Sequence, residues 1–176
     1  MRRVDFFVRC IPPKATAQHK GAVHIPATNR VRIFKTKRVK DSEQCFAALL
    51  RPHVPAEPFG SAVRLEVSFV WPFRVSERKG IRDRLLVPMH THPDFDNISK
   101  TFCDVMTSLF FWADDSLVAD GRIRKFWGVQ PGIHVRIDEI DATNAFEGIE
   151  DGTLALLGVS GLVDVPEEGD LFGGGQ

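Results

Sequence analysis

The sequence has few cysteines, no long apolar run and no net charge. Cys10, Cys45 and Cys103 are an odd, widely spaced set without a Cys-x-x-Cys pair, which argues against disulfides or a zinc site and favours reduced thiols. No stretch approaches the ~18–20 apolar residues of a membrane helix. The first residues lead into a short alternating segment rather than the apolar core of a signal peptide. We therefore expect a soluble, cytoplasmic protein with no membrane partner.

The neutral total hides an uneven distribution of charge. Residues 1–40 contain eleven lysines and arginines and one acid, whereas residues 138–176 contain ten acids and no lysine or arginine. This asymmetry indicates a polyanionic partner or internal shielding of a basic surface. With 176 residues, 43% of them hydrophobic, the chain has enough material for one domain with a real core.

Periodicity of apolar residues predicts a single α+β domain over residues 1–140, with a mixed β-sheet and two main helices. Alternating segments indicate strands, and apolar spacing at 3.6 residues indicates helices. We expect Asp41 or Ser42 to cap the first helix and Asp96 to cap the second. Residues 141–176 are expected to form a loosely ordered acidic, glycine-rich tail. The predicted strands are 3–10, 29–34, 62–70, 117–127 and 132–137, the helices are 41–51 and 97–111, and the loops include 14–20 and a basic segment, 74–84.

Two acidic blocks flank the second predicted helix. Asp94 and Asp96 precede it, and the pair 114–115 follows it. If the first block is extended, His90, His92 and the two acids point the same way, because residues two apart share a face. A helix of ~15 residues carries the chain ~22 Å. The blocks can therefore meet only if a crossover brings the chain back beside the first block.

Carboxylates at one point would have a clear chemical use. Hard oxygen ligands select Mg²⁺ or Mn²⁺, which can activate water and neutralise charge on a phosphodiester. Lys100, one helical turn in, could stabilise that charge, and Asp104 is spaced to pair with it. Taken alone, such acids are more often caps or turn residues. Likewise, His90 and His92 are more often exposed loop histidines than metal ligands.

These blocks carry a resemblance to a known family. The sequence Asp94-Phe95-Asp96-Asn97-Ile98-x-Lys100-x-x-x-Asp104, followed by Trp112-Ala113-Asp114-Asp115-Ser116-Leu117-Val118 and later Lys125, resembles the RusA family of Holliday junction resolvases, many of them carried by phages and prophages. The similarity covers about residues 4–138. The paired acid blocks are specific, and the rest of the similarity is much less so.

The resemblance implies a RusA-like fold and a homodimer that cuts four-way DNA junctions by hydrolysis in recombination and repair, with Mg²⁺ or Mn²⁺. It also implies that the cytoplasm is that of a bacterial or phage-infected cell. It assigns Asp94, Asp96 and Asp115 as metal ligands, with Asp114 as the adjacent acid, and Lys100 as the catalytic lysine. Two features depart from the family pattern. His92 stands where a basic residue commonly precedes Pro-Asp, and the acidic tail is not a family feature.

Basic residues on both sides of the acids favour a DNA surface over solvated loops, because carboxylates repel phosphate unless cations reverse the local potential. Two other functions stay open: a fork- or flap-directed nuclease of the same chemistry, and a junction-binding protein that does not cut. At the tail, residues 169–172 resemble short motifs that dock into replication partners. The candidate DNA-binding residues are Lys14, Arg78, Lys79, Arg82, Arg84, Arg124 and Lys125.

Overall fold

The computed structural model describes residues 2–16, 20–25, 29–141 and 145. The chain divides into a unit of residues Met1–Glu139 and a second unit, Ile140–Gln176. Only the first is described almost throughout. The predicted acidic tail and its docking motif therefore lie almost wholly outside the described residues. In the described part, no helix is long and apolar enough to cross a membrane.

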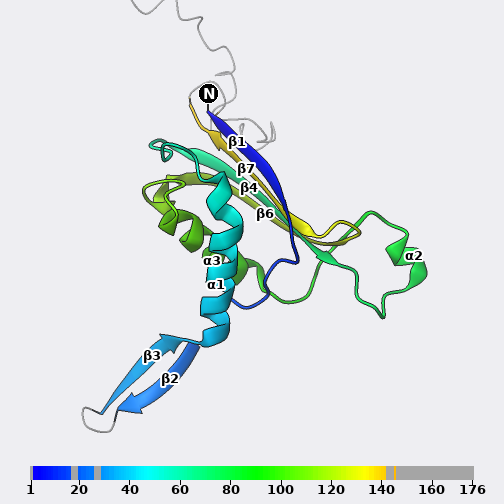
Figure 1. The fold of residues 1–176 in the computed structure, drawn as a ribbon, viewed down its shortest axis with the longest axis horizontal. Coiled ribbons are helices and arrows are strands. Elements are labelled where there is room, and N and C mark those ends of the chain that lie inside the picture. Colours follow the sequence, from blue (N-terminus) through cyan, green and yellow to red (C-terminus); the bar gives the residue numbers. More distant parts are fainter. Residues whose placement is uncertain (1, 17–19, 26–28, 142–144, 146–176) are drawn as a thin grey trace, which may run out of the picture. The chain divides into compact units, whose positions relative to one another are not determined.

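The first unit is built on a five-stranded sheet with the order β1-β7-β4-β6-β5. Its central strands β4 and β6 are parallel, and every other neighbouring pair is antiparallel. The sheet is therefore mixed, which confirms the predicted α+β class (Figure 1). The strands are β1 (Arg3–Arg9), β4 (Val63–Pro72), β5 (Leu86–Pro88), β6 (Val118–Gly128) and β7 (Gly132–Glu139).

Two helices, α1 (Lys37–Leu50) and α3 (Phe95–Ser108), lie side by side on one face of this sheet (Figure 1). They meet the sheet through aromatic rings. Phe102 of α3 makes edge contacts with Phe46 of α1 and Phe69 of β4, at centroid distances of 5.3 and 5.1 Å. All three rings are fully buried. Such pairs add to the free energy of burying the rings themselves.

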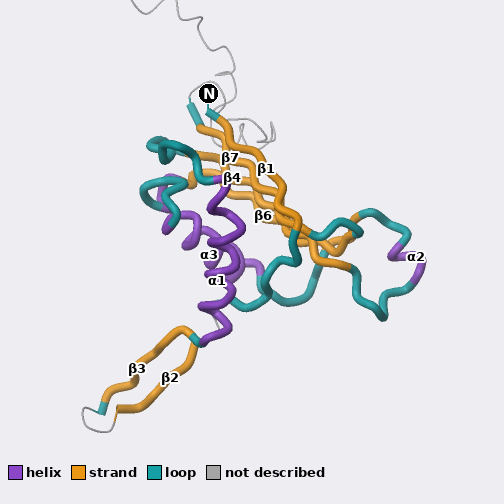
Figure 2. Tube along the Cα trace, in the orientation of Figure 1, coloured by secondary structure: helices purple, strands orange, loops and turns teal. Residues whose placement is uncertain are grey.

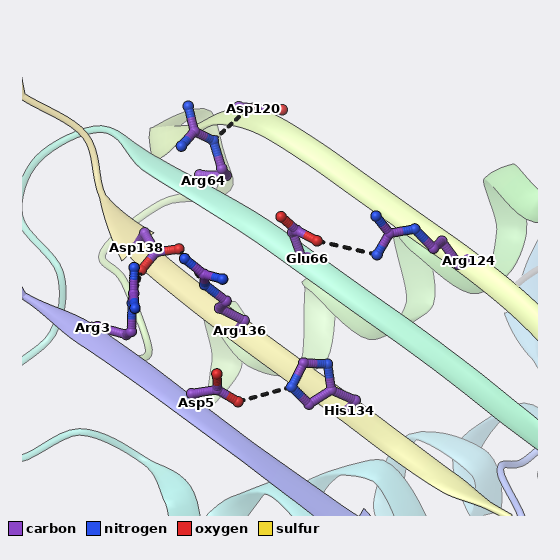
Figure 3. A network of polar contacts seen from close by, with 9 residues as sticks. All are labelled: Arg3, Asp5, Arg64, Glu66, Asp120, Arg124, His134, Arg136 and Asp138. Carbon is purple, nitrogen blue, oxygen red and sulfur yellow. Dashed lines mark hydrogen bonds and ion pairs between the residues drawn. The ribbon is translucent and has the colours of Figure 1, made fainter. Parts of the chain in front are cut away.

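The opposite face of the sheet is not covered by these helices and carries charged side chains that pair with one another (Figure 3). Strand alternation sends the odd-numbered residues of β4 into the core and its even-numbered residues to this open face. Arg64 binds Asp120 at 2.6 Å, and Glu66 binds Arg124 at 3.1 Å. The remaining pairs are Arg3–Asp138, Arg136–Asp138 at 2.6 Å and His134–Asp5 at 2.8 Å.

Several predicted boundaries were wrong. Helix α1 begins at Lys37 with Thr36 at its N-cap, not at Asp41 or Ser42, so its first turn is basic. The second predicted strand pairs with one that was not predicted, in a separate two-stranded sheet of β2 (Lys20–Ile25) and β3 (Arg30–Lys35). The predicted basic loop contains the single-turn helix α2 (Lys79–Arg82) and leads into the short edge strand β5 (Figure 2).

Candidate active site

The first acidic block lies where the chain enters α3. Asp94 occupies the N-cap, with extended backbone, and Asp96 is already in the first helical turn. The predicted cap at Asp96, and an extended segment running through both acids, are therefore wrong. Asp94 instead contacts His92, with 2.8 Å between Oδ1 and Nδ1, and Asp96 accepts a hydrogen bond from Asn97 at 3.0 Å. Both carboxylates are accessible to solvent.

A cleft of about 470 Å³ opens beside Asp94. The loop after β1 contributes Lys14 to it, and the first turn of α1 contributes Arg38. Both are exposed basic side chains. A carboxylate flanked by cations in a concave site can accept a phosphate that the carboxylate alone would repel. The sequence placed Lys14 among the DNA-binding candidates, whereas Arg38, expected in a basic connection, was expected only to extend the same basic surface.

Trp127, near the end of β6, holds two of the cations in place. The Lys14 ammonium lies 4.8 Å from its ring centroid, and the Arg74 guanidinium lies 5.1 Å away. Arg74, His90 and Trp127 also line a smaller cavity of about 240 Å³. A cation over an indole ring is attracted by the negative ring face. Trp127 therefore keeps two positively charged side chains close together at the end of β6, near the first acidic block.

Lys125 precedes Trp127 by two residues and lies on the same, helix-covered face of β6, in register with Phe69. Its ammonium donates hydrogen bonds to the carbonyl oxygens of Thr91 at 3.0 Å and Pro93 at 2.5 Å. Its own carbonyl accepts from the Met89 N–H at 2.9 Å. The sequence predicted a DNA contact for this lysine, but in the structure it binds the segment that leads to Asp94.

Lys100 lies one turn into α3, and its ammonium is 3.2 Å from Asp104 Oδ1. The predicted pairing of these two residues is confirmed. Between them lies Cys103, whose thiol pKa is raised to about 11, first by burial and then by the charges of Asp104 and Asp115, with Lys100 opposing. Asp115 is therefore close enough to the middle of α3 for its charge to act there.

The second acidic block divides into two roles. Asp114 caps the short 3-10 helix η3 (Asp115–Leu117), accepting a hydrogen bond from the Ser116 N–H at 2.9 Å. Bonds from the Ser116 hydroxyl and N–H lower the pKa of the Asp114 carboxyl. Asp115 is exposed in the first turn of η3. Of the pair, Asp114 is already engaged in local structure, so Asp115 is the better candidate ligand.

The acids do not form a closed metal site in the described residues, where no three His, Cys, Asp or Glu side chains are grouped to hold an ion. Asp94 and Asp96 are at the start of α3. Asp115 is near enough for its charge to raise the pKa of Cys103, which is seven residues or about 10 Å along the helix axis from Asp96. The chain does return to α3, because η3 contacts that helix. The donor set itself, accessible carboxylate oxygens, has the chemistry that Mg²⁺ and Mn²⁺ prefer.

The other predicted DNA-binding residues lie in two places. One group surrounds α2, where Arg82 donates to the Arg74 carbonyl at 3.0 Å. Arg124 is on the open face of the sheet, paired with Glu66, and thus on the other side from the cleft. A DNA role stays a prediction for the residues around α2, whereas the pairing of Arg124 with Glu66 argues against a DNA contact by Arg124. The exposed basic residues around α2 are Arg78, Lys79, Arg82 and Arg84.

Comparison with known proteins decides the family. Residues 11–138 match the family model described as endodeoxyribonuclease RusA. The chain belongs to the RusA endodeoxyribonuclease family. This confirms the resemblance drawn from the two acidic blocks, and it places the chain among hydrolases for which branched DNA is the implied substrate. The RusA match begins two residues after β1 and ends within β7, and it includes both acidic blocks, Lys100 and the cleft residues Lys14 and Arg38.

A curated relative shows similarity of the same extent. The chain is 26% identical over 135 residues to a protein of Bacillus subtilis (strain 168) named "Uncharacterized protein YqaN". The alignment covers 74% of this chain and 92% of the relative. The name of that protein states no activity, so the RusA assignment depends on the family match.

Proposed function

We propose that this RusA-family protein is a Mg²⁺- or Mn²⁺-dependent endodeoxyribonuclease that resolves four-way DNA junctions in recombination and repair. The observation that carries the proposal is the cleft at the start of α3, where Lys14 and Arg38 flank Asp94 within the RusA match. Cations beside a candidate metal ligand are what a phosphodiester substrate needs.

Each residue would have a distinct task. Asp94, Asp96 and Asp115 would hold the metal, which when bound supplies Lewis-acid activation of water and neutralises phosphate charge. Lys14 and Arg38 bind the phosphates next to the scissile one. Lys100, kept in place by Asp104, stabilises negative charge that develops during hydrolysis. His92, whose Nδ1 lies 2.8 Å from Asp94 Oδ1, would have to move away for that oxygen to bind a metal.

Because the three carboxylates do not form one group in the described residues, we propose that their side chains would converge when metal and DNA are bound. Two features support this. Asp96 and Asp115 are exposed, so their side chains can change rotamer at little cost. The second acidic block lies in a single 3-10 turn joining α3 to β6, which is easier to shift than a strand or a long helix.

Resolution of a junction requires incisions in two opposed strands, and each chain contributes one set of acids. We therefore propose a homodimer as the active form. Sedimentation of the free protein and of its junction complex would measure this. A monomer in both samples would contradict the dimer without touching the chemistry.

The deciding experiment uses a labelled immobile four-way junction with the unmodified protein, Asp94→Asn and Asp115→Asn, in Mg²⁺ or Mn²⁺. Asp41→Asn, an exposed acid on α1, is the matched control. We expect each site variant to lose at least about 10²–10³-fold in cleavage rate, as when a charge-stabilising group is removed. Junction binding should stay within about twofold, and the control should cut normally.

The same assay separates the rival functions. Faster cutting of fork or flap substrates than of the junction would favour a fork-directed nuclease of the same chemistry. The absence of a three-acid cluster in the described residues favours the second rival, a junction-binding protein without activity. Binding without cleavage by the unmodified protein, at every divalent metal tried, would establish that rival and end the proposal.

A further inference from the structure

We propose that Lys125 is a positioning residue that fixes the acid-bearing start of α3 to the central sheet, and not a DNA contact. The inference rests on the proposed function for its catalytic meaning. Its geometric part stands on the hydrogen bonds of Lys125 alone.

Three hydrogen bonds join Lys125 to one short segment. Its carbonyl binds the N–H of Met89, and its ammonium binds the carbonyls of Thr91 and Pro93. The five residues from Met89 to Pro93 are therefore fastened at their beginning, middle and end to one residue of β6. The next residue is Asp94, whose carbonyl accepts the first helical hydrogen bond, from Ile98 at 3.1 Å.

The position of Lys125 in the strand makes this role specific. Ile123, Lys125 and Trp127 alternate onto the helix-covered face of β6, where the register neighbours on β4 are Val67, Phe69 and Trp71. A charged ammonium on such a face is costly unless it is hydrogen-bonded. The two loop carbonyls supply those bonds. A lysine suits this position because its ammonium has three hydrogen-bond donors and no acceptor, and both partners are carbonyl oxygens that accept.

The consequence is a mechanical link between the cationic side and the acidic side of the site. Trp127 orders Lys14 from the same strand that holds the Asp94 loop through Lys125. Residues that support a metal ligand from behind commonly change metal affinity by about 10–100-fold when replaced. Lys125 would thus tune the site without touching substrate.

The test compares Lys125→Met, which keeps the aliphatic stem, with Lys125→Arg and with the control Arg124→Met, its neighbour on the opposite face. In metal-free protein, amide hydrogen exchange is measured at Met89 and Ile98. We expect at least about tenfold faster exchange in Lys125→Met, with an intermediate effect in Lys125→Arg and none in the control. Thermal unfolding confirms that each variant is folded.

Two further measurements separate positioning from DNA contact. Mn²⁺ affinity without DNA, followed by electron paramagnetic resonance, should fall about 10–100-fold in Lys125→Met, and kcat should fall with little change in KM. Junction affinity and its salt dependence in EDTA should stay as in the unmodified protein.

The opposite pattern would overturn the proposal: unchanged exchange, together with weaker junction binding and a salt slope smaller by about 0.9, the value for one lost phosphate contact. The failure of the proposed function would look different. A protein that cuts no junction would still show the exchange difference, because that measurement needs neither metal nor DNA.

Discussion

The two faces of the central sheet use charge in different ways. On the open face, arginines and acids from neighbouring strands neutralise one another in pairs (Figure 3). On the helix-covered face, the charged groups gather at one end of β6, where Lys125 binds main-chain carbonyls and Lys14 lines the cleft. Neighbouring residues of one strand, Arg124 and Lys125, thus belong to different systems. On the open face, charged side chains stabilise the sheet by pairing with one another. On the helix-covered face, they lie near the candidate active site.

The largest expected effect comes from the core beneath the helix-covered face. Phe102→Ala removes a fully buried ring that joins α1, α3 and β4, and it should lower the free energy of unfolding by about 3–5 kcal/mol. Glu66→Gln, which weakens one half-exposed pair on the open face, should cost at most about 1 kcal/mol. Urea denaturation of both variants measures the difference. Equal losses would mean that the open face is as structurally important as the core.

A second prediction sharpens the comparison for DNA. The double variant Lys14→Met/Arg38→Met should bind a four-way junction about tenfold more weakly and reduce the slope of log affinity against log salt by about 1.8, for two lost phosphate contacts. Arg124→Met should leave both quantities unchanged, because its guanidinium is paired with Glu66 on the other face. Fluorescence anisotropy over a salt series measures this. A reversed result would put the DNA on the open face.

The smallest expected effect is on the pH dependence of stability, and it concerns the thiol of Cys103 in α3. The pKa of Cys103 is raised to about 11 in the folded protein, mainly by burial, whereas an unfolded cysteine ionises near 9. Between pH 9 and 11 the unfolded chain therefore binds fewer protons, and stability falls as pH rises. A shift of two pKa units corresponds to about 2.7 kcal/mol. Because the thiol is only partly buried, solvent screening lowers the expected loss to about 1–2 kcal/mol.

This loss is measured by determining the free energy of unfolding as a function of pH for Cys103→Ser and, as a control, for Cys45→Ser, whose thiol is exposed. The sequence contains no tyrosine, so no phenol titrates in the same window. Cys10, whose pKa is also raised to about 11 by burial and by Cys45, leaves part of the slope in place. An unchanged slope in Cys103→Ser would mean that this thiol is accessible in the folded state.

Much of the fold could be predicted because alternation is a strong signal in strands with one buried face. Strand β4 was placed within two residues at its end, since Val63 to Phe69 alternate without a break. The missed elements lack that signal. Strand β5 has only three residues, at the edge of the sheet, which is too few to show alternation. In β2 the second residue is a glycine, which has no side chain to contribute to a pattern. Helix α1 was begun too late because Lys37, Arg38 and Lys40 surround a single buried apolar residue, Val39.

The family could be predicted from residue types and their order, but the geometry around the candidate site residues could not. The acids and Lys100 stood out because their order matched a family pattern that the family comparison supports. Spacing alone could not say that Asp94 rather than Asp96 occupies the N-cap position of α3. It also could not separate Arg124 from Lys125, although strand alternation puts them on opposite faces. Applying that alternation to Lys125, between Ile123 and Trp127, would have indicated an inward-facing lysine.

The pairing of β1 with β7 has a consequence for how the chain folds. Arg3 is aligned with Asp138, 135 residues later, and β7 also separates β1 from β4. Until β7 has been made, neither of those two strands has its partner on that side. Contacts so distant in sequence slow folding, because a long loop must close before they form. A chain interrupted before Gly132 would expose two unpaired strand edges, and such edges recruit other chains. Synthesis of β7 is therefore the step that commits this domain to its native sheet.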